Sequence, residues 1–167
     1  VFVHGFLTLN GNKMSKSKGN FLLADQYAAE LKSDFLRYYL ASKLTNKIDD
    51  IDFNLEDFQK KVNTDLVGKF INIASRVQKF LKSNGNRIGS ELDEKIVDSF
   101  RNETSAIFND YVTLDYSNAI KKIMKLADSA NQYIDHNQPW VLAREKVNEK
   151  EVIKISSTGM NLFRILN

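Results

Sequence analysis

Apolar residues recur at helical spacing through most of this chain, and that periodicity constrains the fold more than any other feature. Successive residues of an α-helix are rotated by about 100° about its axis, so apolar residues at this spacing lie along one face of a helix. The chain has only 7 Gly and one Pro in 167 residues, so little interrupts these helices. The three series are Val62, Leu66, Phe70, Ile73, Val77 and Phe80 or Leu81; Ile96, Phe100, Ile107 and Tyr111 or Val112; and Ile120, Ile123, Met124, Ala127, Ala130 and Ile134. We predict a mainly α fold with an antiparallel α-helical bundle.

The first part of the chain predicts a short mixed α/β head. Val1–Leu9 is apolar with β-branched and aromatic residues, which favours one strand or two short ones. Asn10-Gly11-Asn12 is typical of a hairpin turn. Helical spacing resumes from Ala24, and Lys47–Phe53 predicts an acidic connector. We therefore expect two domains, residues 1–53 and residues 54–167.

Several residues predict where helices begin and end. Ser33 or Asp34 can cap a helix that contains residues 35–40. Asn54 can cap the next helix, with Asp57 able to reach back as in a capping box. Asn84-Gly85-Asn86 predicts the end of that helix, and Pro139 can open a short helix at its first position.

Composition narrows the classes of protein that fit. The absence of Cys excludes a disulfide framework and a Cys-based zinc site. The sequence shows no secretory signal and no apolar stretch of membrane-spanning length, so we expect a cytoplasmic protein without a membrane partner. The net charge of +3 permits a polyanionic partner. The chain opens on the apolar run Val1–Phe6 without Met, and we expect it to be an internal part of a longer protein.

The run Lys13-Met14-Ser15-Lys16-Ser17-Lys18-Gly19-Asn20 carries the clearest chemical signal. It places three ammonium groups, two hydroxyls and a glycine in eight residues. Lysines can neutralise negative charge that develops on a polyphosphate, while hydroxyls and loop amides donate hydrogen bonds to it. A solvated basic turn is the simplest alternative for a lysine-rich loop.

The order Lys13-Met14-Ser15-Lys16-Ser17 resembles the second ATP-binding motif of class I aminoacyl-tRNA synthetases. Stretches along the rest of the chain resemble the methionyl-tRNA synthetases within that class. The leucyl, isoleucyl and valyl families share the lysine-rich loop, so the methionyl assignment depends on the last two stretches. The five stretches that resemble the methionyl family are residues 2–12, 36–40, 48–53, 67–76 and 133–140, and the last two are residues 67–76 and 133–140.

The resemblance implies a reaction and its partners. Methionine and ATP, with Mg2+ implied, would form methionyl-adenylate and pyrophosphate, and the methionyl group would pass to tRNA(Met). Lys16, assisted by Lys13, would be catalytic by stabilising the triphosphate in the transition state. Lys13, Ser15, Lys16 and Ser17 would bind ATP.

Other parts of that machinery are absent from this chain. It has no H-I-G-H-type motif, and the methionine pocket and a metal-binding knuckle, with any zinc, would lie outside it. Any dimer contact would lie outside it as well. We predict that this polypeptide alone does not activate methionine.

A second candidate site is implied on the helical part. Asn72 and Arg76 are four residues apart and share a helix face, and both can bond unpaired bases. From spacing alone, an ordinary polar flank is the commoner interpretation, and Trp140 would be a core-edge residue. The resemblance instead assigns Asn72, Arg76 and Trp140 to anticodon binding, with Trp140 stacking on a base. Asp135 and His136 are interpreted as helix-end residues.

No metal site is predicted within the chain. The carboxylates of Asp49, Asp50 and Asp52 offer no evident ligand geometry, and we interpret them as capping groups or partners of nearby Lys and Arg. Three alternatives to the methionyl assignment remain at this point. They are a fragment of another class I synthetase of the Leu, Ile or Val type, a non-catalytic helical RNA-binding module, and a helical bundle without an RNA partner.

Overall fold

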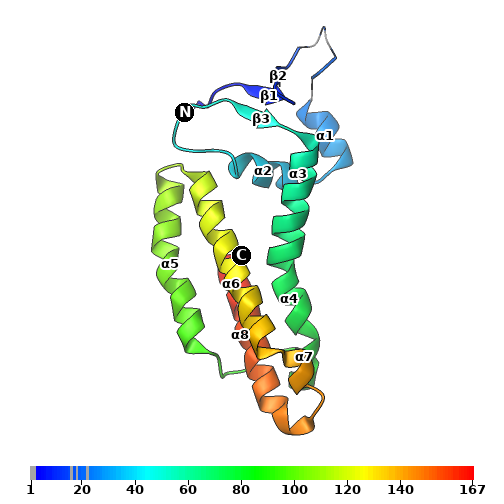
Figure 1. The fold of residues 1–167 in the computed structure, drawn as a ribbon, viewed down its shortest axis with the longest axis vertical. Helices are drawn as coiled ribbons and strands as arrows, with labels where there is room; N and C mark the ends of the chain where they lie inside the picture. Colours follow the sequence, from blue (N-terminus) through cyan, green and yellow to red (C-terminus); the bar gives the residue numbers. More distant parts are fainter. Residues whose placement is uncertain (1–2, 16, 18, 22) are drawn as a thin grey trace. The chain divides into compact units, whose positions relative to one another are not determined.

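A computed structural model describes residues 3–15, 17, 19–21 and 23–167 of the chain. It is mainly helical with one small sheet, which confirms the predicted fold class (Figure 1). Among the helices in these ranges, none combines the length and apolarity that a bilayer crossing requires. The elements in chain order are β1 (Leu7–Leu9), β2 (Asn12–Lys13), α1 (Ala24–Glu30), α2 (Ser33–Ala41), β3 (Ile51–Phe53), α3 (Leu55–Val62), η2 (Asn63–Ile71), α4 (Asn72–Val77), η3 (Gln78–Asn84), α5 (Glu94–Val112), α6 (Tyr116–Asn137), α7 (Pro139–Leu142), η4 (Lys146–Asn148) and α8 (Glu149–Leu166).

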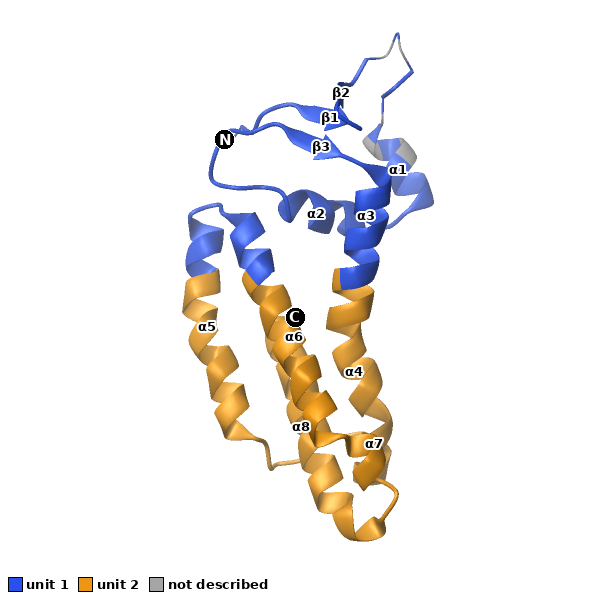
Figure 2. Ribbon diagram, viewed as in Figure 1, with its two compact units in different colours: residues 1–64, 108–121 blue, residues 65–107, 122–167 orange. Residues whose placement is uncertain are grey.

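Backbone contacts divide the chain into two compact units (Figure 2). Unit 1 comprises residues 1–64 and 108–121, and unit 2 comprises residues 65–107 and 122–167. These units describe packing. The division into functional domains at residue 54 is a separate matter and stays a prediction.

The sheet of unit 1 is built on a tight hairpin. Asn10 and Gly11 have φ values of 50° and 73°, the left-handed backbone that a two-residue hairpin turn requires. They join β1 to β2, which pair antiparallel with Thr8 opposite Lys13. Strand β3 lies on the other side of β1 and runs parallel to it, with Leu7 opposite Ile51. The predicted turn is therefore confirmed.

The predicted acidic connector is wrong over its last part, because residues 51–53 form β3. The carboxylates of Asp50 and Asp52 accept hydrogen bonds from residues 6–11, whereas the Asp49 carboxylate accepts one from Thr45. Asp50 accepts a hydrogen bond from the Phe6 amide at 2.7 Å, and Asp52 accepts from the Gly11 amide at 2.7 Å. The donors at Gly11 and Thr8 lower the pKa of Asp52. The parallel pairing of β1 with β3 brings these amides within reach of the two carboxylates, which therefore accept hydrogen bonds from the backbone.

Tyr39 anchors the helices of unit 1 beneath the sheet. It is fully buried, and its ring meets Phe53 and Phe58 edge-on at centroid distances of 5.5 and 5.4 Å. Its hydroxyl donates to the Asp57 carboxylate at 2.8 Å, and the Lys43 ammonium lies 2.7 Å from the same oxygen. These contacts join α2 to α3.

The structure corrects two of the predicted caps and confirms a third. Asn54 accepts a hydrogen bond from the Asp57 amide at 2.9 Å, which confirms it as the N-cap of α3. Asp57 does not reach back to complete a capping box, because its carboxylate accepts from Tyr39 and Lys43. Ser33 is already helical, and Lys32 at the N-cap of α2 makes no side-chain capping bond.

The single long helix predicted after Asn54 changes its winding along its length. It is α-helical in α3, π-helical in η2, α-helical again in α4 and 3₁₀-helical in η3. Gly85, with φ at 65°, ends it as predicted. The expected inward residues that are buried are Val62, Ile73, Val77 and Leu81. Tertiary packing therefore preserves the apolar face while the local hydrogen-bond spacing varies.

The core of unit 2 is formed where α4 and α8 approach closely. A Cβ added to Gly159 of α8 would lie 3.2 Å from Val77 and 3.4 Å from Ile134, so the absence of a side chain permits this packing. Within unit 2 the successive long helices run in alternating directions (Figure 1). The buried cluster consists of Ile73, Val77, Val97, Phe100, Ala127, Ala130, Ile134 and Leu162.

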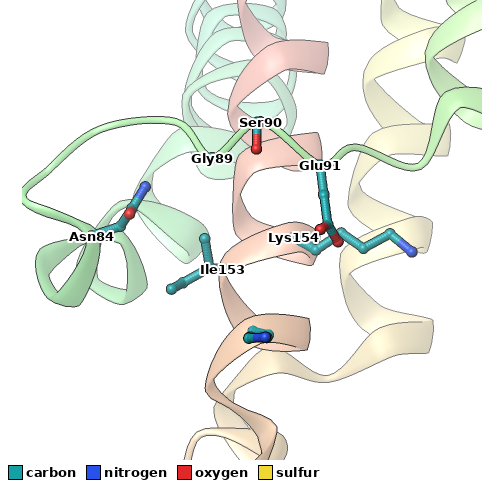
Figure 3. A pocket seen from close by; sticks show the side chains of 7 residues that line it. Asn84, Gly89, Ser90, Glu91, Ile153 and Lys154 are labelled. Atoms are coloured by element: carbon teal, nitrogen blue, oxygen red, sulfur yellow. The ribbon is translucent and has the colours of Figure 1, made fainter.

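The loop before α5 is fastened to α8 by side-chain hydroxyls. The Gly89 amide donates to Ser157 Oγ at 2.8 Å, and the Asp93 amide donates to Thr158 Oγ1 at 2.9 Å. Figure 3 shows Gly89 and Ser90 passing over Ile153 of α8, beside a small hollow of about 220 Å3. Buried hydroxyls of α8 thus satisfy backbone amides that belong to no helix or strand.

We predict that Ser157→Ala lowers the free energy of unfolding by about 1–3 kcal/mol, because it leaves the Gly89 amide without its acceptor. Ser156→Ala is the matched control. Ser156 is equally buried, but its hydroxyl has no hydrogen-bond partner in the described part of the chain, so its loss should be neutral or stabilising. Urea denaturation measures both. Equal destabilisation by the two variants would contradict this account of the loop.

Candidate functional site

The lysine-rich loop leaves the hairpin at Lys13, the last residue of β2, and is closed by Asn20. The Asn20 amide group donates to the Lys13 carbonyl oxygen at 3.0 Å, and Asn20 Oδ1 accepts from the Ser15 amide at 3.0 Å. Gly19, with φ at 69°, provides the left-handed backbone just before it. Asn20 therefore fixes the two sides of the loop base to each other. The sequence places Asn20 at the end of the lysine-rich run but did not predict this bidentate role.

The described members of the predicted ATP-binding set, Lys13, Ser15 and Ser17, lie around this base. Ser15 and Ser17 hydroxyl oxygens are 2.9 Å apart and hydrogen-bond to each other. The Lys13 ammonium lies 5.4 Å from the centre of the exposed Phe6 ring. Lys16, the predicted catalytic lysine, lies outside the described residues. The described part of the loop thus presents hydroxyls and one cation above a fastened base, which suits binding of an anionic group.

The second candidate site lies in unit 2, where the structure brings Arg76 and Trp140 together. The Arg76 guanidinium carbon is 5.0 Å from the centre of the Trp140 ring, in cation–π geometry. The same guanidinium pairs with the Asp135 carboxylate. Trp140 is half-buried and also packs against the core cluster. Trp140 therefore lies at the edge of the core, and its ring also contacts the Arg76 guanidinium.

Local sequence explains how Trp140 reaches this position. Helix α6 ends at Asn137, and Gln138 has a left-handed φ of 44° that turns the chain sharply. Pro139 then occupies the first position of α7, as predicted. The turn places Trp140 one residue into a new helix and directs its ring to α4.

Asn72 is oriented by α6 one helical turn before Arg76. Its amide group donates to Asn131 Oδ1 at 3.0 Å, and the Asn131 amide group donates to the Lys69 and Ala127 carbonyl oxygens, both at 2.9 Å. The Asn72 side chain is half-buried, so this bond restricts its rotation. Sequence analysis predicted that Asn72 and Arg76 share a face but did not predict Asn131.

A regular set of contacts joins this face to α6. Three pairs, Lys69–Asp128, Asn72–Asn131 and Arg76–Asp135, each join residues 59 positions apart, and we call them the three rungs. The Lys69 and Asp128 side chains are 2.8 Å apart. The hydrogen bond from Arg76 lowers the pKa of Asp135, whose carboxylate therefore stays ionised. Asp135 lies in the last turn of α6, as the sequence indicated, and it is also the partner of Arg76.

The described residues contain no group of three or more His, Cys, Asp or Glu side chains that could hold a metal ion.

Comparisons with known proteins point to one family. The family described as "tRNA synthetases class I (M)" matches residues 1–78. A methionine–tRNA ligase from Dichelobacter nodosus is 44% identical over 168 residues, which cover 99% of this chain and 25% of that protein. The chain thus spans about a quarter of this relative.

Solved structures show the same fold. A Mycobacterium tuberculosis methionyl-tRNA synthetase in complex with methionyl-adenylate superimposes with a TM-score of 0.84 at 25% identity, over 99% of this chain and 34% of that one. The apo form of the M. tuberculosis enzyme superimposes with a TM-score of 0.78 at 20% identity, over 99% of this chain and 33% of that one. This likeness in fold extends over 99% of the chain.

Proposed function

The chain belongs to the methionyl-tRNA synthetase family of class I tRNA synthetases, and from this membership we propose that it forms part of a methionine–tRNA ligase. The complete enzyme would join methionine to tRNA(Met) in the cytoplasm, by way of methionyl-adenylate. The M. tuberculosis relative was solved with that adenylate, which supports the intermediate. This chain would supply the lysine-rich loop to the first step and the anticodon-binding face to the second.

In the first step, the loop would act on the triphosphate of ATP. Negative charge shifts toward the departing pyrophosphate, so a lysine that strengthens its contact as charge develops lowers the barrier. We assign that role to Lys16, with Lys13 assisting and with Ser15 and Ser17 as hydroxyl donors. Mg2+ would enter with ATP. The bidentate bonds of Asn20 support this assignment, because they fix the base from which the loop closes.

In the second step, the face formed by Asn72, Arg76 and Trp140 would bind the unpaired anticodon bases. The observation that carries this proposal is the Arg76 guanidinium held between the Asp135 carboxylate and the Trp140 ring. A planar cation beside an indole offers both bonding and stacking to a base. The Asp135 carboxylate repels phosphate and accepts hydrogen bonds from base amino groups. Together these groups favour a base over a backbone at this point.

The direct test of the proposed function is aminoacylation by the complete enzyme. Methionine should be charged to a tRNA(Met) transcript and far less to the same transcript with an altered anticodon. Equal charging of the two transcripts would refute anticodon reading, and absence of methionine charging would refute the ligase. The 167-residue chain alone should not catalyse ATP–pyrophosphate exchange.

For Lys16, we predict that Lys16→Ala in the complete enzyme slows adenylate formation by roughly two or three decades, the scale of losing one preorganised charge contact. ATP–pyrophosphate exchange measures this rate. Unchanged exchange kinetics in the variant would show that Lys16 has no part in the transition state.

For Asn20, we predict that Asn20→Ala slows adenylate formation by about thirtyfold, since two hydrogen bonds of about 1 kcal/mol each hold the loop base. Affinity for tRNA should be unaffected. Asn12→Ala is the matched control, because the Asn12 side chain bonds only within the hairpin turn, donating to the Asn10 carbonyl at 3.0 Å. A control that slows exchange as much as Asn20→Ala would attribute the effect to the hairpin.

For Trp140, we predict that Trp140→Ala weakens tRNA(Met) affinity by about ten- to a hundredfold, the range for one base stacked on an aromatic ring. Methionine activation should be nearly unchanged. Filter binding and ATP–pyrophosphate exchange measure the two quantities separately. If both fall by the same factor, Trp140 acts only through the stability of the fold.

A further inference from the structure

A groove lies beside η3, which begins two residues after Arg76. It has a volume of about 490 Å3 and lies between η3 on one wall and residues 143–152 on the other. Three lysines line it, Lys79 and Lys82 from η3 and Lys146 from η4. We call it the lysine groove. Phe80, Glu145 and Glu149 also line the groove.

Both walls of the lysine groove follow residues of the candidate anticodon site in the chain. Lys79 and Lys82 are three residues apart in η3, and in a 3₁₀-helix residues three apart project from the same side. Arg76 precedes them, in α4. The rise of about 2 Å per residue separates Lys79 from Lys82 by about 6 Å along the axis. On the other wall, Lys146 follows Trp140 after the short helix α7. On both walls, residues that line the groove therefore lie within a few positions of Arg76 or Trp140 in the chain.

The lysines of this groove differ from the cations beside Asn72. Lys69 and Arg76 are each paired with a carboxylate of α6. Across the described ranges, Lys79, Lys82 and Lys146 form no ion pair, although Glu145 and Glu149 lie in the same groove. All three lysines are exposed, and the Lys79 ammonium lies 4.8 Å from the Phe80 ring centre. Unpaired cations in a concave surface attract a polyanion.

We propose that the lysine groove binds the sugar–phosphate backbone of the RNA nucleotides next to the anticodon triplet, an inference that rests on the proposed function. Lys79 and Lys82 neutralise successive phosphates from one wall, and Lys146 contributes from the other. The Phe80 ring offers an apolar surface to a sugar. Glu145 and Glu149 repel phosphate and so keep the backbone close to η3.

In this arrangement, the contacts that supply affinity are separate from the contacts that supply sequence preference. Contacts to phosphate strengthen binding without regard to sequence, whereas contacts to base edges and faces discriminate. Loss of a groove lysine should therefore weaken all RNAs by the same factor. Loss of Arg76 or Trp140 should change the preference for one triplet over another.

The experiment measures binding of RNA hairpins to the complete enzyme over a range of salt concentrations. One hairpin carries the methionine anticodon CAU in its loop, and a second carries a changed triplet. Lys79→Ala, Lys82→Ala and Lys146→Ala are compared with Lys95→Ala, a matched control at an exposed lysine of α5 outside the groove. Thermal unfolding checks that all variants fold alike.

Each groove variant should weaken both hairpins by about fivefold at 0.1 M salt and reduce the slope of log affinity against log salt by about 0.7, the value for one single-strand phosphate. Lys95→Ala should change neither quantity. Glu149→Gln should have the opposite effect and strengthen binding. A hairpin with neutral methylphosphonate linkages beside the triplet, on the side that occupies the groove, should bind Lys79→Ala as well as it binds the unmodified enzyme.

The possible failures are distinguishable. If groove variants keep the affinity and salt slope of the unmodified enzyme while Trp140→Ala weakens binding, the groove does not hold RNA and the proposed function stands. If groove variants alter triplet preference instead of overall affinity, the backbone role is wrong. If the unmodified enzyme does not distinguish the two hairpins, anticodon reading fails and the groove proposal falls with it.

Discussion

The three rungs between the α4 region and α6 are the contacts on which the proposed RNA-binding face depends. Each rung joins residues 59 positions apart, and a constant offset requires the two helices to run in the same direction with their polar faces in phase. Asn72 and Arg76 are consequently oriented before any ligand arrives. Side chains that are already ordered lose less entropy when they bind, so more of their interaction energy appears as affinity.

The charges on this part of the chain follow a consistent logic. Where a base is proposed to bind, Arg76 is balanced by Asp135, so a bare phosphate gains little there. Where backbone is proposed to bind, the lysines of η3 have exposed side chains. The lysine-rich loop of unit 1 uses another device, because Asn20 fastens the loop at its base.

The features that the sequence predicted correctly depend mostly on neighbouring residues, and those that it missed depend mostly on distant ones. The Asn10-Gly11 turn, the Asn54 cap and the helical periodicity are local, and all three are present. The rungs were not foreseen, because nothing in the spacing of Asn131 or Asp135 identifies a partner 59 residues away. Strand β3 was missed because its pairing with β1 outweighs the low strand propensity of an acidic segment. Assignment of Asn72, Arg76 and Trp140 to RNA came from family resemblance and not from their spacing.

Trp140 is the only tryptophan in the 167-residue chain, so its fluorescence reports on the proposed base-binding face alone. The most direct test is a titration of this chain with a CAU hairpin while tryptophan emission is recorded. Stacking of a base on the indole should change the emission with a saturable dependence on RNA, and a hairpin with a changed triplet should produce much less change at the same concentration. Binding of the CAU hairpin with no change in tryptophan emission would contradict the account, because the RNA would then occupy some other surface.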